Sequence, residues 1–202
     1  DQENNGPAAA RNRGAETASG DVLLFCGDDT IPDRNWCFRH YYNHGRADGP
    51  KTVQGYTLWH PLIADEFHAF LTEVSGIQGN YNVLRTEDGG WRYEIGPAFC
   101  LTTNWSITRS AFENIGGFDE TFKAAAWEDI DIGYRLTRED IHSYFDPGAV
   151  NYHLHRYTLS SFVHRQKKVG HWHPRICLNH PEMAGEQINP YAIREAKKMD
   201  LG

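Results

Sequence analysis

Cysteine is scarce in this sequence of 202 residues, and its four cysteines form no Cys-x-x-Cys pair. Thiols without metal-ligand or redox spacing indicate free cysteines in a reducing compartment. No apolar run approaches the roughly 20 residues of a membrane helix, and no signal peptide is visible, so we expect a cytoplasmic protein. The cysteines are Cys26, Cys37, Cys100 and Cys177.

An excess of positive charge is also missing. Lysine and arginine number 20 against 27 aspartates and glutamates, which gives a net charge of -7. Because nucleic-acid binding relies on basic surfaces, we expect no nucleic-acid partner. Hydrophobic residues make up 40% of the chain and aromatic residues 13%, enough to form a core in one domain or at most two.

Strand-like and helix-like segments alternate along the chain and predict an α/β layered domain. The chain opens with polar residues and enters a helical pattern with no strand before it, so we expect it to begin inside a domain. We predict helices over 8–18, 33–44, 64–74, 127–138, 158–169 and 190–198, and a brief helix that Ser110 caps and that ends at Gly116-Gly117. We predict strands over 22–26, 52–58, 98–103, 142–145 and 149–152.

Two carboxylates, Asp28 and Asp29, directly follow the apolar run 22–26, which we interpret as a buried parallel strand. They can serve simply as turn residues. However, the carboxyl ends of strands are where open α/β sheets bind ligands, and Gly27 allows close backbone approach. The pair therefore also fits a site for Mg²⁺ or Mn²⁺ bridging a diphosphate.

A second acidic cluster opens the predicted helix over 127–138. Acids in a first turn are favoured by the helix dipole, which is the structural alternative. Asp131 and Arg135 form an i,i+4 pair worth roughly 0.2–0.5 kcal/mol, which favours a structural role for Asp131. Glu128 and Asp129 are then left as candidates for a general base. Gly133 is costly inside a helix and predicts tight packing.

The 11 histidines invite a zinc interpretation, but no zinc-binding spacing accompanies them. His153 and His155 point to one side if they lie on a strand, as do His171 and His173. One histidine joining Asp29 around a divalent ion fits better than a zinc site. The basic segment of Arg165, Lys167 and Lys168 is either a solvated helix face or a weak membrane-surface or acceptor contact.

Five motifs follow one another along the chain: Asn5–Gly14, Ala18–Asp21, Phe25–Pro32, Gly116–Glu120 and Glu128–Leu136. Together they resemble family 2 glycosyltransferases, which have the GT-A fold. The order and spacing of the motifs carry the resemblance, which spans residues 5 to about 173. The segments around His153 and over 158–170 are similar to the bacterial members.

The resemblance implies a Rossmann-like mixed sheet flanked by helices and an inverting transfer of a sugar. The donor is a nucleotide-sugar, and the acceptor is a hydroxyl of a polysaccharide, a glycan or a lipid-linked molecule. Peripheral contact with the inner face of the membrane is compatible with such an acceptor. The implied cofactor is Mn²⁺ or Mg²⁺.

Individual residues take roles from the same resemblance. Asp29 matches the metal-binding aspartate of the Asp-x-Asp motif, and its neighbour Asp28 is assigned to the substrate. His153 matches a late histidine near the metal and the diphosphate, with His155 as the alternative ligand. Arg11 matches an arginine close to the nucleotide.

The second acidic cluster supplies the implied catalytic group. Asp129 matches the base that deprotonates the acceptor hydroxyl, and Glu128 is its supporting residue. Trp127, which directly precedes them, is assigned to the substrate site.

The chain departs from the family pattern in three places. Gly27 stands where the first aspartate of the fuller Asp-Asp-Asp form is found, and Thr102-Thr103-Asn104 replaces a Thr-Gly-Asn segment. The first half of the nucleotide pocket would precede Asp1. We therefore expect a partial, N-terminally truncated GT-A domain over 1–175 and a helical tail over 176–202, with little affinity for nucleotide-sugars in the isolated chain.

Two other classes of function stay open. A glycosyltransferase-like binding module without activity would fold normally and show no turnover in the complete protein. A metal-dependent hydrolase built on the aspartate and histidine clusters would cleave its substrate without an acceptor.

Overall fold

The computed structural model describes residues 3–46, 49, 51–75, 79 and 81–184. Their centre is a mixed sheet in the order β1-β5-β3-β6-β2, with β4 paired to β6. The strands are β1 (Val22–Cys26), β2 (Thr30–Pro32), β3 (Thr52–Trp59), β4 (Glu94–Ile95), β5 (Asn104–Thr108) and β6 (Ser143–His153). Only the β3–β6 pair is parallel, while the other pairs are antiparallel.

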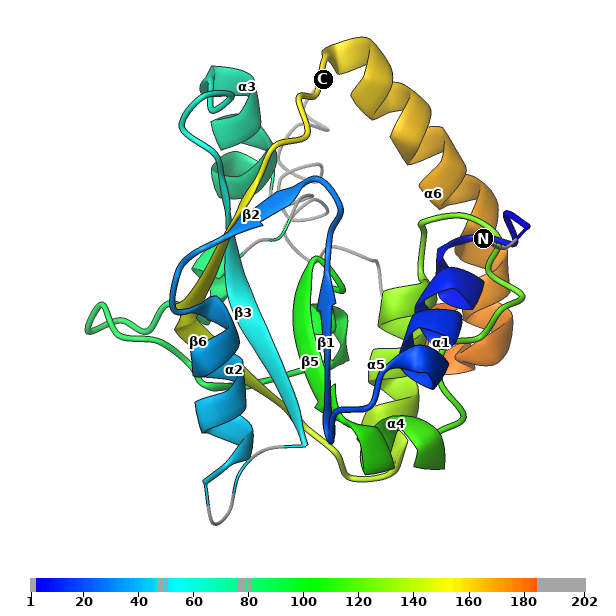
Figure 1. The fold of residues 1–202 in the computed structure, drawn as a ribbon. Coiled ribbons are helices and arrows are strands. Elements are labelled where there is room, and N and C mark those ends of the chain that lie inside the picture. The colour runs from blue at the N-terminus through cyan, green and yellow to red at the C-terminus, as the bar shows by residue number, and fades with distance from the viewer. Residues whose placement is uncertain (1–2, 47–48, 50, 76–78, 80, 185–202) are drawn as a thin grey trace.

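Helices flank this sheet in two groups (Figure 1). Helices α1, α4, α5 and α6 gather beside β1, and α2 and α3 lie beside β6 and β2. The helices are α1 (Pro7–Thr17), α2 (Trp36–His44), α3 (Glu66–Ala69), α4 (Arg109–Asn114), α5 (Glu128–Arg138) and α6 (Leu159–Asn179), with a π-helical turn at Phe70–Val74 and 3₁₀ turns at Tyr81–Leu84, Pro97–Phe99 and Pro181–Ala184.

The main apolar core lies between the first helix group and the strands β1 and β5. Its centre is Trp105 and Ile107 of β5, packed against Phe112 and Phe118 from the α4 region and Ile132 of α5. A Cβ atom at Gly133 would collide with the carbonyl group of Pro97. This confirms the predicted tight packing of α5, which lies against the 3₁₀ turn at Pro97–Phe99.

Several sequence predictions about strands were wrong. The strand over 22–26 exists as β1, but it pairs antiparallel with β5 and is only partly buried. The predicted strand over 98–103 is not formed: a 3₁₀ turn ends at Phe99, and the strand begins only at Asn104, after a loop. The two strands proposed around Pro147-Gly148 are one strand, β6, whose pairing with β3 shifts register between Gly55 and Tyr56. The chain therefore passes the proline and glycine without leaving the sheet.

Helix predictions erred mainly at the ends. Thr108, rather than Ser110, caps α4 by accepting from the Ala111 amide. Helix α2 begins at Trp36 instead of residue 33. Helix α6 runs to Asn179, ten residues beyond the predicted end at 169, with Pro174 inside it. The predicted division of the chain at residue 175 stays a prediction, and the proposed helix over 190–198 lies outside the described residues.

Only some of the apolar side chains in the predicted helix over 64–74 face the core. Leu71 is fully buried, whereas Phe70 is 48% and Val74 68% exposed, because the chain changes from α-helix to a π-helical turn at Phe70. No helix of the described residues is long and apolar enough to cross a membrane.

Candidate active site

The start of α5 is set by an unusual backbone conformation. Trp127, directly before the helix, has a φ of 77°, a left-handed value that is costly for a residue with a bulky side chain. Its indole N–H donates to the carbonyl oxygen of Val169 at 2.8 Å, and its ring packs beside His173 of α6. The assignment of Trp127 to the substrate stays a prediction, but its indole group faces α6.

The two acids that follow have different surroundings. Glu128 is almost fully buried, and its Oε1 atom lies 2.6 Å from Nη1 of Arg11. The other oxygen, Oε2, has no hydrogen-bond partner among the described residues. Arg11 also lies over the ring of Phe118, 5.6 Å from its centre. These contacts connect the predicted nucleotide-side arginine to the acidic pair.

Asp129 is half-buried and makes a single hydrogen bond among the described residues, from the Ile130 amide at 2.9 Å to its Oδ1 atom. Loss of water around the carboxyl group raises the pKa of Asp129, and the neighbouring charge of Glu128 raises it further, to about 7. The positive charges of Arg11 and Arg165 oppose this shift. A carboxylate with a pKa near neutrality is suited to accept a proton at physiological pH.

The other predicted centre forms where the loop after β1 meets the end of β6. His153 Nε2 lies 3.1 Å from Asp29 Oδ1, and His155 Nδ1 lies 3.4 Å from Asp29 Oδ2. The Leu154 amide donates to the Asp29 carbonyl oxygen at 2.8 Å, so the backbone also fixes this contact. His153 stacks on Trp59, and burial lowers its pKa while Asp29 opposes that shift. His153 and His155 therefore point to one side, as predicted. His171 and His173 do not form such a strand pair, because both lie on the helix α6.

The donor set of this centre is suitable for a divalent ion only in part. One carboxylate and two imidazoles match the ligands that Mn²⁺ accepts, yet their atoms now bond to one another rather than to a common point. No group of three or more metal-binding side chains is arranged to hold an ion within the described residues. Asp28 is exposed. Further oxygen ligands from a bound diphosphate would be needed to complete the shell.

Comparison with known proteins decides the family. The family described as "Glycosyl transferase family 2" matches residues 1–116, more than half of the chain. The chain belongs to glycosyl transferase family 2. Two curated relatives, both named pre-mycofactocin glycosyltransferase and from two strains of Mycobacterium tuberculosis, are 26% identical over 188 residues, which is 88% of this chain and 36% of theirs. This family 2 chain thus spans about a third of their length.

Solved structures show that the fold of this glycosyltransferase chain is the GT-A fold. A mannosyltransferase from Pyrobaculum calidifontis, solved with GDP-Man and Mn²⁺, aligns with a TM-score of 0.56 at 16% identity over 98% of this chain and 60% of that one. The enzyme GalNAc-T7, solved with UDP, GalNAc and Mn²⁺, aligns with a TM-score of 0.51 at 15% identity, over 99% and 42% of the two chains. The mixed sheet with flanking helices is confirmed as GT-A-like.

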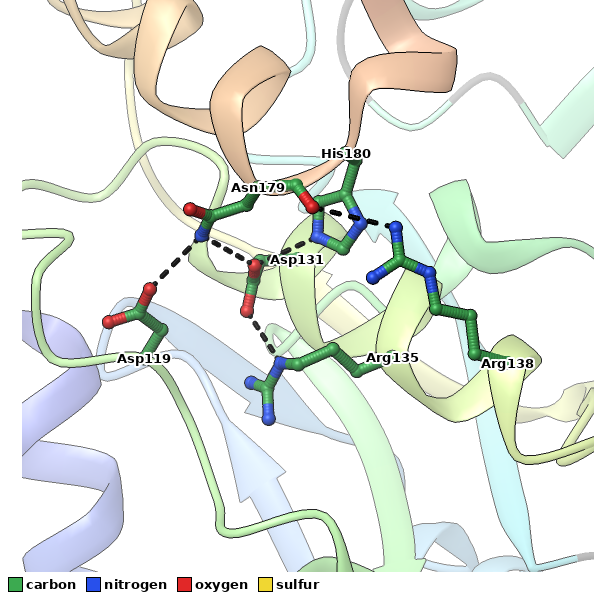
Figure 2. Close-up of a pocket in the computed structure, with 6 residues that line it drawn as sticks. All are labelled: Asp119, Asp131, Arg135, Arg138, Asn179 and His180. Carbon is green, nitrogen blue, oxygen red and sulfur yellow. Dashed lines mark hydrogen bonds and ion pairs between the residues drawn. The ribbon is translucent and has the colours of Figure 1, made fainter.

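The structure of this family 2 chain also contains a pocket of about 330 Å³ where the ends of α5 and α6 meet (Figure 2). Asp131 stands at its centre. One of its oxygens lies 2.8 Å from Arg135 Nε, and the other lies 3.1 Å from Asn179 Nδ2 and 2.9 Å from His180 Nε2. Asp119 accepts from the same Asn179 amide, so two acidic motifs hold the end of α6.

The acidic residues of α5 therefore lie on two different sides of the helix. Residues two apart on a helix are rotated by about 200°, so Asp129 faces away from the pocket that Asp131 occupies. The predicted Asp131–Arg135 pair is confirmed. The expected 0.2–0.5 kcal/mol is the value for an exposed helical pair. Asp131 is instead 1% exposed, and it accepts a hydrogen bond from Asn179, 48 positions away, as well as from its helical neighbour. Nothing in the local sequence pointed to Asn179 or His180.

Asp131→Asn is therefore expected to lower the free energy of unfolding by about 2–4 kcal/mol, since it removes a buried charge from Arg135 and His180. Urea unfolding of the two proteins measures this. Asp140→Asn is the matched control, because the Asp140 side chain is 98% exposed and asparagine tolerates its left-handed backbone. Equal stability of both variants would contradict the role of Asp131 as the anchor of α6.

Proposed function

We propose that this chain supplies the base and part of the metal centre of an inverting glycosyltransferase. The observation that carries the proposal is Asp129, a carboxylate whose pKa is raised to about 7 at the start of α5, in a chain of family 2. The proposed substrates are a nucleotide-sugar donor and a hydroxyl of a glycan, a polysaccharide or a lipid-linked acceptor.

The proposed reaction is a single displacement. The acceptor oxygen attacks the anomeric carbon of the sugar, and Asp129 takes the hydroxyl proton. The bond between that carbon and the diphosphate oxygen breaks, with its electron pair leaving on the diphosphate. Glu128, held by Arg11, keeps a negative charge beside Asp129 and so makes Asp129 a stronger base.

Asp29, His153 and His155 are the residues that would hold Mn²⁺ or Mg²⁺ together with diphosphate oxygens. A divalent ion there supplies positive charge that stabilises the departing diphosphate. Two structural neighbours were solved with Mn²⁺ and a nucleotide or nucleotide-sugar, which supports this assignment. The backbone bond from Leu154 to Asp29 positions the ligand pair before the donor binds.

The direct test uses the full-length protein that contains this chain. We expect release of a nucleoside diphosphate from one member of a panel of nucleotide-sugars, with Mn²⁺ and a mixture of glycan and polyprenyl acceptors. Release that depends on the acceptor supports transfer. Release at the same rate without acceptor would favour a hydrolase, and no release with any donor would favour an inactive binding module.

The outer face of α6 supports the further proposal that the enzyme touches an anionic membrane surface. This helix has no acidic residue in a chain of net charge -7. Lys167 and Lys168 are exposed on it, and Leu159 and Val163 are 68% and 44% exposed nearby. Cationic and apolar side chains on one helix surface are the combination that binds a lipid headgroup layer.

Replacing Lys167 and Lys168 together by glutamate is expected to weaken binding to vesicles of phosphatidylcholine with about a third phosphatidylserine by at least about 10-fold. Co-sedimentation of the full-length protein measures the binding. A control with Arg34 and Lys51 changed to glutamate alters charge equally at exposed sites away from α6. Equal losses in both variants would contradict a specific contact through α6.

A further inference from the structure

Arg165 stands on the inward side of α6, unlike the other basic residues of that segment. It lies three residues after Phe162 and four before Val169, and both of these pack against the body of the protein. Because residues three and four apart share a helix face, Arg165 faces the same way. It is half-buried, whereas its neighbours Lys167 and Lys168 are exposed.

This arginine has no partner within the part of the chain that the structure describes. None of the hydrogen bonds or ion pairs found there involves its guanidinium group. Other partly buried arginines do have partners: Arg11 has Glu128, Arg39 has Asp146 and Arg135 has Asp131. A partly desolvated guanidinium carries five donors, so an unpaired one is suited to an anion from outside the chain.

The position of Arg165 is fixed from both sides. Before it, Thr158 and Ser161 form a reciprocal capping box that sets the first turn of α6. After it, the Val169 carbonyl oxygen accepts from the indole of Trp127, the residue that precedes the acidic pair. The arginine is therefore held between the end of β6 and the start of α5.

Its charge reaches both parts of the site. The positive charge of Arg165 acts on Asp129 and, separately, on His153 and Tyr157. His153 and Asp129 belong to the two acidic centres that the proposed reaction must bring to one substrate. Arg165 lies on the inward side of α6, between the end of β6 and the start of α5, and is therefore placed to reach a diphosphate bound between these two centres.

We propose that Arg165 binds the diphosphate group of the donor and stabilises it as it leaves the sugar. A planar guanidinium can donate two parallel hydrogen bonds to phosphate oxygens, which fixes the orientation of the group as well as its charge. This inference rests on the proposed function for the sugar transfer, but the binding of a diphosphate can be measured without it.

The test is calorimetric binding of inorganic pyrophosphate to the full-length protein in the presence of Mn²⁺. Arg165→Ala is expected to weaken binding by about 10- to 100-fold, the range for lost charged hydrogen bonds. Arg165→Lys keeps the positive charge but loses the two parallel donors of the guanidinium group. Its affinity for pyrophosphate should therefore lie between those of the wild type and Arg165→Ala. Lys51→Ala removes an exposed positive charge just before β3, at the end of that strand away from His153, and should bind as the wild type does.

Three results would overturn the proposal: no pyrophosphate binding by the wild type, unchanged binding by a folded Arg165→Ala variant, or an equal loss in Lys51→Ala. Circular dichroism and thermal unfolding establish that the variants are folded. If Arg165→Ala loses pyrophosphate binding while the wild type transfers no sugar from any donor, the diphosphate site stands and the proposed transferase function fails.

Discussion

Asp129→Asn is expected to lower the turnover of the full-length enzyme by about 10²- to 10⁴-fold, the usual cost of losing a positioned base. Asparagine keeps the shape of the side chain and the oxygen that accepts from the Ile130 amide, so the start of α5 should be unchanged. Donor affinity should change little, because Arg165, Asp29 and His153 are intact. Steady-state kinetics with donor and acceptor varied separately measure both effects.

A matched variant separates the base from its neighbour. Glu128→Gln removes the negative charge that helps to raise the pKa of Asp129, so the acid limb of the turnover profile should move to lower pH. Turnover at high pH should persist in that variant. If Asp129→Asn keeps full turnover while Glu128→Gln or Asp131→Asn abolishes it, the assignment of the base is wrong.

The raised pKa also predicts an effect on stability. Between the unfolded pKa near 4 and the folded pKa of about 7, the native state binds the proton more tightly than the unfolded chain does. Ionisation of Asp129 therefore costs stability as the pH rises through this window. Asp129→Asn should exceed the wild type in unfolding free energy by on the order of 2 kcal/mol at pH 8, and this gain should vanish near pH 4.

Asp29→Ala is expected to reduce metal-dependent transfer by about 10²-fold or more, since it removes the carboxylate that faces both histidines. The affinity for Mn²⁺ in the presence of a nucleoside diphosphate should fall in parallel, which calorimetry can measure. Asp21→Ala is the control. Asp21 is an exposed acid just before β1, at the other end of that strand from Asp29.

Two outcomes would contradict this metal site. The first is a wild-type rate that survives excess chelator, because the chemistry would then not use a divalent ion. The second is an equal loss of activity in Asp21→Ala and Asp29→Ala, because the loss would then follow from removing any negative charge rather than a metal ligand. His153→Ala and His155→Ala, compared in the same assay, separate the two candidate histidine ligands.

Local patterns in the sequence predicted those parts of the fold that depend on neighbouring residues. The apolar run of β1, the helix after Trp127 and the pair Asp131–Arg135 all follow from spacing within one element. Strand pairing does not, since it depends on distant segments. Pro147 and Gly148 resembled the end of a strand, yet the register shift of β3 at Gly55 accommodates them inside β6.

The candidate site, like the fold, could be predicted from the sequence only in part. Family resemblance placed Asp29 and His153 together, and the structure brings them into contact. The sequence grouped Arg165 with the solvent-facing lysines, because the helix was predicted to end at 169 and its inward side was not defined. Only the full length of α6, with Val169 and Ile176 packed inward, separates Arg165 from Lys168.

The anomeric configuration of the first product formed by the full-length enzyme tests the central claim most directly. A base such as Asp129 that activates the acceptor for single displacement requires inversion at the anomeric carbon. Proton NMR of the product, recorded before any mutarotation or rearrangement, distinguishes the two anomers. We expect the configuration opposite to that of the donor, and a product that retains the donor's configuration would contradict a single displacement with Asp129 as the base.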